Sequence, residues 1–228
     1  MAQVKKNTTI KGYQDFIQRV YGENNNRSFG RRDMLINIER FATRGLKGIR
    51  KQDTKKAKFN LLISFSWLMS LMNRFNVDLE NEVWKRFPYL CSYCASCPCS
   101  CKAKKVKSRQ KVLVNEKKRP KTLEEFQNMF ARIYPPGTRS LEHAGIHLAE
   151  EIGELAEVLL AYRGGHKEED LKNIPLESSD VFSCFAGIFN SIGESMAKEL
   201  FVIFSNNCHI CKKIPCVCSF KTITEFKS

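Results

Sequence analysis

One arrangement of cysteines occurs twice in this chain, and it restricts the fold more than any other feature of the sequence. The stretch "CSYCASCPCSC" at 91–101 and the stretch "CHICKKIPCVC" at 208–218 both contain the pattern C-x2-C-x4-C-x-C. Each shared cysteine of the second cluster lies 117 positions after its counterpart in the first. Because two unrelated clusters would rarely have all three spacings in common, the pattern predicts an internal duplication.

The expected compartment decides what these cysteines do. The chain begins with "MAQVKKNTTIKGY", in which no apolar stretch follows the basic residues, so we expect no signal peptide. The longest apolar run, at 59–72, is shorter than the roughly 18 residues that span a bilayer. We therefore expect a soluble, cytoplasmic protein without a membrane partner. In that compartment thiols stay reduced, and C-x2-C spacing indicates metal before disulfide.

Each cluster is predicted to bind one structural Zn²⁺, which gives two zinc ions per chain. Four thiolates suit tetrahedral Zn²⁺ and leave no position open for water, and an iron–sulfur cluster is the alternative. Cys97 and Cys184 fall outside the shared pattern and are predicted to be spare thiols. The predicted zinc ligands are Cys91, Cys94, Cys99 and Cys101 in the first cluster, and Cys208, Cys211, Cys216 and Cys218 in the second.

Apolar residues recur at helical spacing, and sustained strand-like alternation is absent, so the sequence predicts an all-α fold. We expect two tandem helical-bundle repeats that form a pseudo-dimer: 1–101 with its zinc knuckle, a linker at 102–121, and 122–228 with the second knuckle. Without a gap, 60–91 aligns with 177–208 at low identity. The predicted helices are 10–21, 31–50, 58–76 and 78–88, then 122–134, 140–162, 176–192 and 194–206, with loops after Tyr21 and Tyr134.

Positive charge is concentrated between the two repeats. Of the formal net charge of +14, a large part comes from 102–121, which holds ten Lys or Arg residues and a single acid, Glu116. We expect this segment to be a solvated, partly disordered connector, because like charges repel and no aromatic residues are interleaved. Nucleic-acid binding through this basic linker is the alternative.

Acidic residues in the second half form a different pattern. In the helix at 140–162, Glu151 and Glu154 lie opposite the apolar face, together with His143, His147 and Glu150. In the next helix, Glu177 and Asp180 share the apolar stripe, where acids are costly unless a cation or hydrogen bonds compensate. If the two helices pack antiparallel, the four carboxylates converge into an all-oxygen site that suits Mg²⁺. The alternative is that basic partners elsewhere neutralise these acids.

The spacing Glu150-Glu151-x-x-Glu154, 22 residues, then Glu177-x-x-Asp180 resembles the E-E-x-x-E, spacer, E-x-x-D signature of the all-α, MazG-like nucleoside triphosphate pyrophosphohydrolases. The similarity covers about 122–206, and terminal cysteine knuckles are not part of the family pattern. It implies cleavage of an NTP or dNTP into monophosphate and pyrophosphate, in a bundle assembled from paired copies. It also implies that Glu151, Glu154, Glu177 and Asp180 hold Mg²⁺ and that Glu150 is a supporting catalytic acid.

Other side chains near this signature are weaker candidates. His143 and His147 precede Glu151 by one or two helical turns and could contact substrate, although a surface histidine is more often idle. Arg163 and Lys167, at the end of the helix and in the loop after it, could contact phosphate.

The first half has lost the acidic signature. The counterparts of the five acids are Ile38, Glu39, Ala42, Asn60 and Ile63, so only Glu39 remains. One carboxylate cannot hold Mg²⁺ alone, and we expect this copy to be catalytically dead. Its first long helix carries a basic stripe instead, which is either a solvated face or a source of cations for the triphosphate. The stripe consists of Arg40, Arg44, Lys47 and Lys51.

Two functions therefore remain open. The first is the Mg²⁺-dependent pyrophosphohydrolase, with a nucleoside triphosphate as substrate. The second is a zinc-knuckle nucleic-acid-binding or adaptor protein, which the net charge, the linker and two lysines in the second cluster, Lys212 and Lys213, favour. Pairing of further copies into a homo-oligomer is compatible with both.

Overall fold

The structure is a computed structural model, and it describes residues 4–165 and 168–227. Within these residues the regular structure is helical, so the predicted all-α class is confirmed. No helix in this part of the chain has the length and apolar content needed to cross a membrane. The helices are α1 (Ile10–Ser28), α2 (Arg31–Arg50), α3 (Thr54–Arg74), α4 (Leu79–Arg86), α5 (Cys101–Lys104), α6 (Leu123–Ile133), α7 (Leu141–Gly165), α8 (Glu168–Leu171), α9 (Ile174–Ser191), α10 (Met196–Phe204) and α11 (Phe220–Glu225), with a 3₁₀ turn at Glu116–Lys118.

Local capping explains where several helices begin. The Thr9 hydroxyl accepts a hydrogen bond from the Gly12 N–H at 2.7 Å, and the Thr122 hydroxyl accepts one from the Glu125 N–H at 3.1 Å. These bonds satisfy N–H groups that have no partner inside the first turn of a helix. The ends of α2 coincide with the predicted helix at 31–50, and most other long helices differ from prediction by a few residues.

The prediction that the first helix ends near Tyr21 is wrong, because α1 continues to Ser28. The intervening "GENNN" lacks apolar residues and therefore resembled a loop. In the structure the first two of its three asparagines are buried and bonded to distant groups. Asn24 Nδ2 donates to the Cys218 carbonyl at 2.9 Å, and Asn25 Nδ2 donates to Ser70 Oγ at 3.0 Å. Burial of these polar side chains is compensated by the bonds, so the helix can extend into the interior.

A buried glutamine makes the same three hydrogen bonds in each half of the chain. Gln14 of α1 donates from Nε2 to Asn73 Oδ1 at 3.0 Å and to the Val77 carbonyl at 2.7 Å, and its Oε1 accepts from the Leu79 N–H. Gln127 of α6 forms the corresponding bonds. Its partners each lie 117 positions after those of Gln14, and they are Asn190, Glu194 and Met196.

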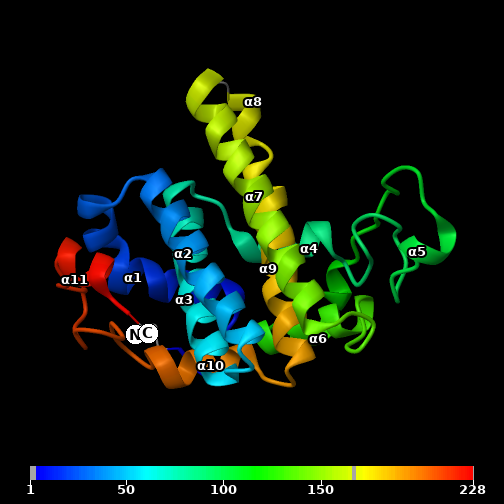
Figure 1. Ribbon diagram of the computed structural model, residues 1–228. Helices are drawn as coiled ribbons and strands as arrows, with labels where there is room; N and C mark the ends of the chain where they lie inside the picture. The colour runs from blue at the N-terminus through cyan, green and yellow to red at the C-terminus, as the bar shows by residue number, and fades with distance from the viewer. Residues whose placement is uncertain (1–3, 166–167, 228) are drawn as a thin grey trace.

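Helices of the two halves interleave (Figure 1). Helix α2 packs against α7, and α4 from the first half has more contact with α9 of the second half than with α1 of its own. Buried side chains from both halves form one continuous core. Within it, the Phe65 ring lies 5.6 Å from that of Phe182 and 5.8 Å from that of Phe185. Neither half buries its apolar faces without the other.

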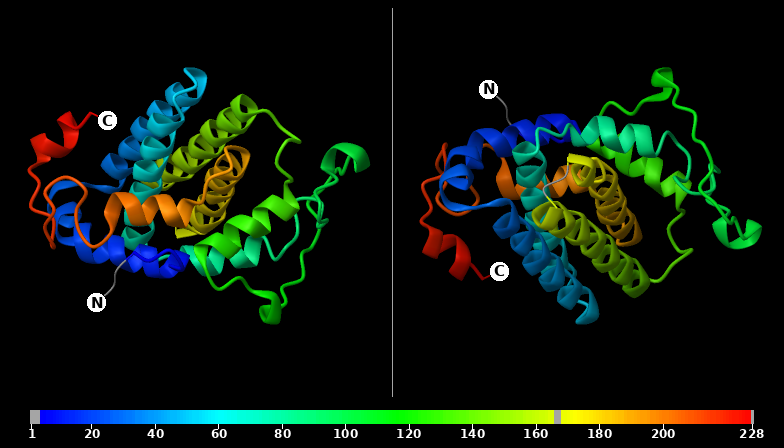
Figure 2. Two further views of the ribbon diagram at one scale, coloured as in Figure 1. Left: turned by 90° about the horizontal axis from the view of Figure 1, so that it is seen from below. Right: turned by 90° about the horizontal axis from the view of Figure 1, so that it is seen from above.

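The cysteine clusters are exchanged between the halves. We call 91–101 the first knuckle and 208–218 the second knuckle. The Cys99 N–H of the first knuckle donates to the Ile133 carbonyl of α6, and the Cys216 N–H of the second donates to the Val20 carbonyl of α1, both at 2.7 Å. Each knuckle is therefore bonded to the first helix of the other half. The knuckles and the segments that follow them lie at opposite ends of the molecule (Figure 2).

The two long helix pairs are spaced differently. Helices α2 and α3 approach closely, because a Cβ added at Gly48 would lie 2.7 Å from the Ala57 nitrogen and one at Gly45 would lie 2.6 Å from Leu61 Cγ. In α7 and α9, a Cβ added at Gly153 or Gly187 would meet nothing within 4 Å. The first pair is therefore in close contact near the C-terminal end of α2, whereas the second pair leaves space beside Gly153 and Gly187.

The basic linker is exposed along most of its length but is tied to the body at several places. The Gln110 N–H donates to the Tyr93 carbonyl at 2.8 Å, and Trp84 Nε1 donates to Glu116 Oε1 at 3.0 Å. The linker thus returns to the first knuckle and to α4 before α6 begins.

Candidate metal sites

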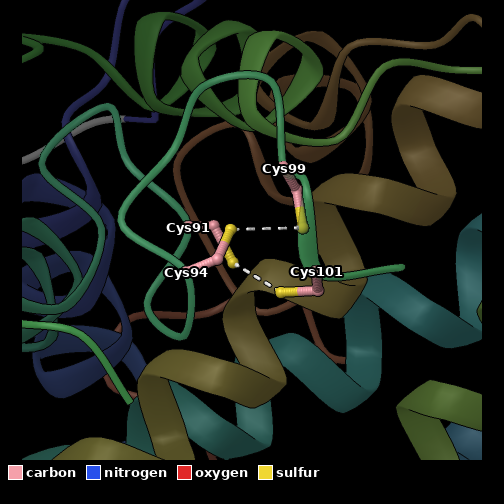
Figure 3. A group of neighbouring side chains, drawn as sticks. All are labelled: Cys91, Cys94, Cys99 and Cys101. Carbon is pink, nitrogen blue, oxygen red and sulfur yellow. Dashed lines mark hydrogen bonds between the residues drawn. The ribbon is translucent and has the colours of Figure 1, made fainter. Parts of the chain in front are cut away.

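The four sulfur atoms of the first knuckle point toward one another (Figure 3). The Sγ atoms of Cys91 and Cys101 are 3.7 Å apart, those of Cys94 and Cys99 are 3.9 Å apart, and all four lie within 4.8 Å of one another. Tetrahedral Zn²⁺ with Zn–S bonds of about 2.3 Å requires sulfur atoms about 3.8 Å apart. The cluster therefore has the ligands and the spacing that zinc needs.

The second knuckle repeats this geometry. The Sγ atoms of Cys208 and Cys218 are 3.8 Å apart, those of Cys211 and Cys216 are 4.0 Å apart, and the four again form one group. All ten cysteines of the chain are free thiols. Both predicted four-cysteine clusters are thus present, and each can hold a zinc ion.

Backbone N–H groups point at sulfur in corresponding places of the two knuckles. The Tyr93 N–H lies 3.5 Å from Cys91 Sγ, and its counterpart Ile210 N–H lies 3.4 Å from Cys208 Sγ. Burial alone would raise the pKa of the Cys94 thiol, but backbone N–H groups that donate to its sulfur lower this pKa to about 6. Such donors favour the thiolate, which is the form that binds metal.

The second half also contains a group of carboxylates. Helices α7 and α9, joined through α8, run antiparallel (Figure 1) and bring oxygens of Glu151, Glu177 and Asp180 within 4.8 Å of one another. The side chains of Glu151 and Asp180 are 14% and 13% exposed. Glu154 lies at the exposed edge and is hydrogen-bonded to Glu177, whereas Glu150 is exposed and outside the group. We call Glu151, Glu154, Glu177 and Asp180 the carboxylate cluster.

Crowding of these acids disfavours their ionised forms. Burial and the negative charges of Asp180 and Glu154 raise the pKa of Glu177 to about 7. Burial, with the charges of Glu151 and Asp180, also raises the pKa of Glu154. In addition, Glu151 Oε2 is buried without a hydrogen-bond partner. A cation among these groups would relieve the repulsion and occupy the unpartnered oxygen.

One cation from the first half already reaches the cluster. Arg86, the last residue of α4, donates from Nε to Asp180 Oδ1 at 3.1 Å and from Nη2 to Asp180 Oδ2. The side chains are 11% and 13% exposed, so the ion pair is largely shielded from water. Burial raises the pKa of Asp180, and Arg86 opposes this rise. The alternative expected from the sequence, a basic partner for these acids, thus holds for Asp180.

Sequence reasoning missed Arg86, although a signal was present. In the alignment of the halves, Asp180 corresponds to Ile63, and Arg86 corresponds to Ile203. Arg86 and Asp180 are both charged, whereas their counterparts, Ile203 and Ile63, are both apolar. Such a paired exchange between the two aligned halves is a signal of contact across them.

Three members of the carboxylate cluster line a pocket of about 350 Å³. Glu151, Glu154 and Asp180 lie on one side, and the first knuckle forms part of the wall. Two cationic side chains, Arg109 of the linker and Arg139 before α7, also line the pocket. The pocket therefore combines a site for cations with groups that attract anions.

The remaining candidates are placed as follows. His147 lies in the pocket, with Nε2 3.0 Å from Glu151 Oε1, whereas His143 is exposed. The Sγ of Cys184 lies 3.4 Å from His147 Nδ1, so Cys184 contacts a pocket residue. Arg163 lies about 18 Å along α7 from Glu151, beside a separate apolar depression. Lys167 lies outside the described residues.

The four residues of the basic stripe in the first half have two different environments. Arg40 donates from both terminal nitrogens to the carbonyls of Ile223 and Thr224 at 3.0 Å, and Arg44 donates to the Phe226 carbonyl at 2.9 Å. These arginines hold the C-terminal segment against α2. The other two members, Lys47 and Lys51, are exposed.

Comparisons with models of known protein families, with curated proteins and with solved structures find no match to this chain.

Proposed function

We propose that the chain is a Mg²⁺-dependent nucleoside triphosphate pyrophosphohydrolase, which cleaves an NTP or dNTP into a monophosphate and pyrophosphate. The convergence of Glu151, Glu177 and Asp180, two of which (Glu151 and Asp180) line a polar pocket, supports this most strongly. Mg²⁺ is typically bound through a few carboxylates together with substrate phosphates. The reaction itself is inferred from the resemblance of 122–206 to the MazG-like family.

In this proposal Glu151, Glu154, Glu177 and Asp180 hold the magnesium. When bound, Mg²⁺ neutralises triphosphate charge and makes water a better nucleophile. The chain keeps the carboxylates fixed and close together, and their raised pKa values fit an arrangement that is complete only with a cation. Glu150, next to the cluster on α7, keeps the proposed role of supporting acid.

The cationic side chains have separate tasks. Arg86 fixes the orientation of Asp180 through two bonds, and therefore acts as a positioning residue. Arg109 and Arg139, in the lining of the pocket, would bind the phosphates and neutralise charge that develops on the leaving pyrophosphate. Arg139 also lies 3.4 Å from His147 Nδ1, so its guanidinium is placed beside the cluster.

We further propose that the chain is a tandem duplication folded as a pseudo-dimer, with one structural zinc ion in each knuckle. The matching glutamine networks and the reciprocal knuckle contacts support the duplication. Because the first half supplies Arg86 and a wall of the pocket, it would be retained without acids of its own. Free thiols in both knuckles fit a reducing compartment such as the cytoplasm.

Pyrophosphate release from a panel of common and modified NTPs and dNTPs, with Mg²⁺ present, tests the proposal. Glu177→Gln and Asp180→Asn should each remove most of the activity, since they keep size but delete a ligand charge. Glu150→Gln should slow turnover less. Glu157→Gln is the matched control, because Glu157 is an exposed acid of the same helix outside the cluster. Release of orthophosphate, or equal activity in Asp180→Asn, would reject the mechanism.

The second candidate is a zinc-knuckle protein that binds nucleic acid. The exposure of the basic linker and of Lys212 and Lys213 in the second knuckle favours it. Binding to a phosphate backbone should weaken by roughly 10³-fold or more between about 50 and 200 mM salt, in proportion to the number of phosphate contacts. Charge reversal of Lys111 and Lys117 should then abolish binding but leave pyrophosphate release unchanged.

A further inference from the structure

A second group of metal-binding side chains adjoins the carboxylate cluster. His147 of α7 lies between Cys184 of α9 and Glu151, with Nδ1 3.4 Å from Sγ and Nε2 3.0 Å from Oε1. One ligand atom from each of the three residues lies within 4.8 Å of the other two. The group is separate from both knuckles and differs from the carboxylate cluster in its donor atoms, which are sulfur, nitrogen and oxygen.

The three side chains are accessible to an ion from the pocket, which all three line. Cys184 is buried at 6% exposure, whereas the His147 side chain is 36% exposed. The Oε1 atom of Glu151 faces the imidazole, and its Oε2 is buried without a partner. Glu151 therefore has one oxygen beside the imidazole and a second that is free to bind an ion.

We propose that Cys184, His147 and Glu151 bind a third Zn²⁺, beside the carboxylate cluster. A thiolate, an imidazole and a carboxylate match a borderline cation such as Zn²⁺, whereas Mg²⁺ prefers oxygen ligands alone. Three protein ligands leave the fourth position of a tetrahedral ion open toward the pocket, unlike the closed knuckles. On binding, the thiol proton would pass to solvent, and the contacts that join His147 to Cys184 and to Glu151 would be replaced by bonds to the ion.

The first half lacks this ligand set. The counterparts of Cys184 and His147 are Trp67 and Leu35, neither of which binds metal, and only Glu39 remains at the position of Glu151. The expected stoichiometry is therefore three zinc ions per chain and not four. Because Glu151 belongs to both groups, zinc at this site should weaken Mg²⁺ binding at the carboxylate cluster.

Zinc titration of the full chain, with both knuckles already loaded, tests the inference by elemental analysis and calorimetry. The unsubstituted protein should bind one further equivalent, for a total of three. Cys184→Ser and His147→Gln should each retain two. Cys97→Ser is the matched control, because Cys97 is exposed and outside every ligand group, and it should retain three.

Cobalt provides a second measurement that reports the ligand. Co²⁺ added to the zinc-loaded protein should give a thiolate-to-cobalt absorption band that is absent in Cys184→Ser, with circular dichroism as the check on folding. A third equivalent that binds Cys184→Ser equally well would place the ion in the carboxylate cluster and overturn the proposal. So would a total of two in the unsubstituted protein. Neither readout depends on hydrolysis, so a failure of the proposed activity is seen separately.

Discussion

The two halves of this chain place a pocket at corresponding positions, and only the second half leaves it open. In the second half the pocket measures about 350 Å³, and charged side chains such as Glu151 and Arg139 line it. In the first half the corresponding space measures about 40 Å³, and its lining is largely apolar, with aromatic side chains that include Phe41, Trp67 and Phe226. One helical frame can therefore support either a filled core or a polar pocket.

A few counterpart positions account for the difference. Phe226 of the C-terminal segment corresponds to Arg109 of the linker. Phe226 lines the pocket of the first half, and Arg109 lines that of the second. Trp67 fills space in the first half that the smaller Cys184 leaves free in the second. Large aromatic side chains thus close one pocket, while small and charged ones keep the other open. The comparison shows that the side chains lining the space, and not the order of the helices, decide whether a pocket exists.

The largest loss of stability should come from substitutions in the knuckles, where the two halves are alike. Cys91→Ser and Cys208→Ser should each lower the free energy of unfolding by several kcal/mol, because metal-binding energy in such small units is folding energy. Thermal unfolding with zinc analysis measures this, and Cys97→Ser should have little effect. Similar losses are expected from both substitutions, since the two sulfur geometries match. Loss of zinc without loss of stability would contradict a structural role.

Substitutions can replace the ion pair between Arg86 and Asp180 with the apolar pair found at the corresponding positions in the alignment of the halves. Arg86→Ile should destabilise the magnesium-free protein by about 3 kcal/mol, because it leaves a shielded carboxylate without its partner. The double substitution Arg86→Ile with Asp180→Ile reproduces the apolar pair Ile203 and Ile63, and it should regain much of that loss. Urea unfolding of both singles and the double gives the coupling energy. Additive effects would show that the two side chains do not act as a pair.

Glycine substitutions probe the spacing of the two helix pairs. Gly48→Ala should cost about 1–3 kcal/mol, because the added Cβ would lie 2.7 Å from the Ala57 nitrogen and force α2 away from α3. Gly153→Ala should instead stabilise α7 by about 0.5–1 kcal/mol, since the new Cβ meets open space and alanine favours the helix. Chemical unfolding of both variants measures the contrast. Equal destabilisation would contradict the open space beside Gly153.

Local patterns in the sequence predicted the features that depend on local physics. The bounds of α2 follow from apolar periodicity, and the sulfur geometry of each knuckle follows from cysteine spacing. The approach of Glu177 and Asp180 to Glu151 could also be anticipated, because acids on an apolar stripe require compensation. These contacts lie within one helix, one knuckle or one helix pair.

Contacts between the halves could not be read in the same way. Arg86 and Asp180 are separated by 94 positions, and nothing near Arg86 indicates which acid it meets. The extension of α1 depends on Asn24, whose partner Cys218 is 194 positions away. The aromatic filling of the first pocket depends on the return of the C-terminal segment to α2. Each of these outcomes is decided by packing across the molecule.

The smallest expected effect concerns the pH dependence of the carboxylate cluster, which the first half lacks. The pKa of Glu177 rises from 4.5 to about 7 in the folded, magnesium-free protein, chiefly through burial. The folded state therefore holds this proton more tightly than the unfolded state, and the stabilisation is complete below about pH 4.5 and lost as the pH rises through 7. Glu177→Gln does not titrate, so relative to the unsubstituted protein it should gain about 1 kcal/mol between these limits, with screening by solvent allowed for. Urea unfolding near pH 5 and pH 8 in magnesium-free buffer measures this gain. The buffer contains no chelator, because a chelator would also remove metal from the knuckles. The control variant Glu157→Gln should show no gain. Added Mg²⁺ should stabilise only the protein that retains Glu177, and so remove the difference in stability between the two proteins at pH 8. A stability gain of Glu177→Gln that persists with Mg²⁺ would count against a cation in this cluster.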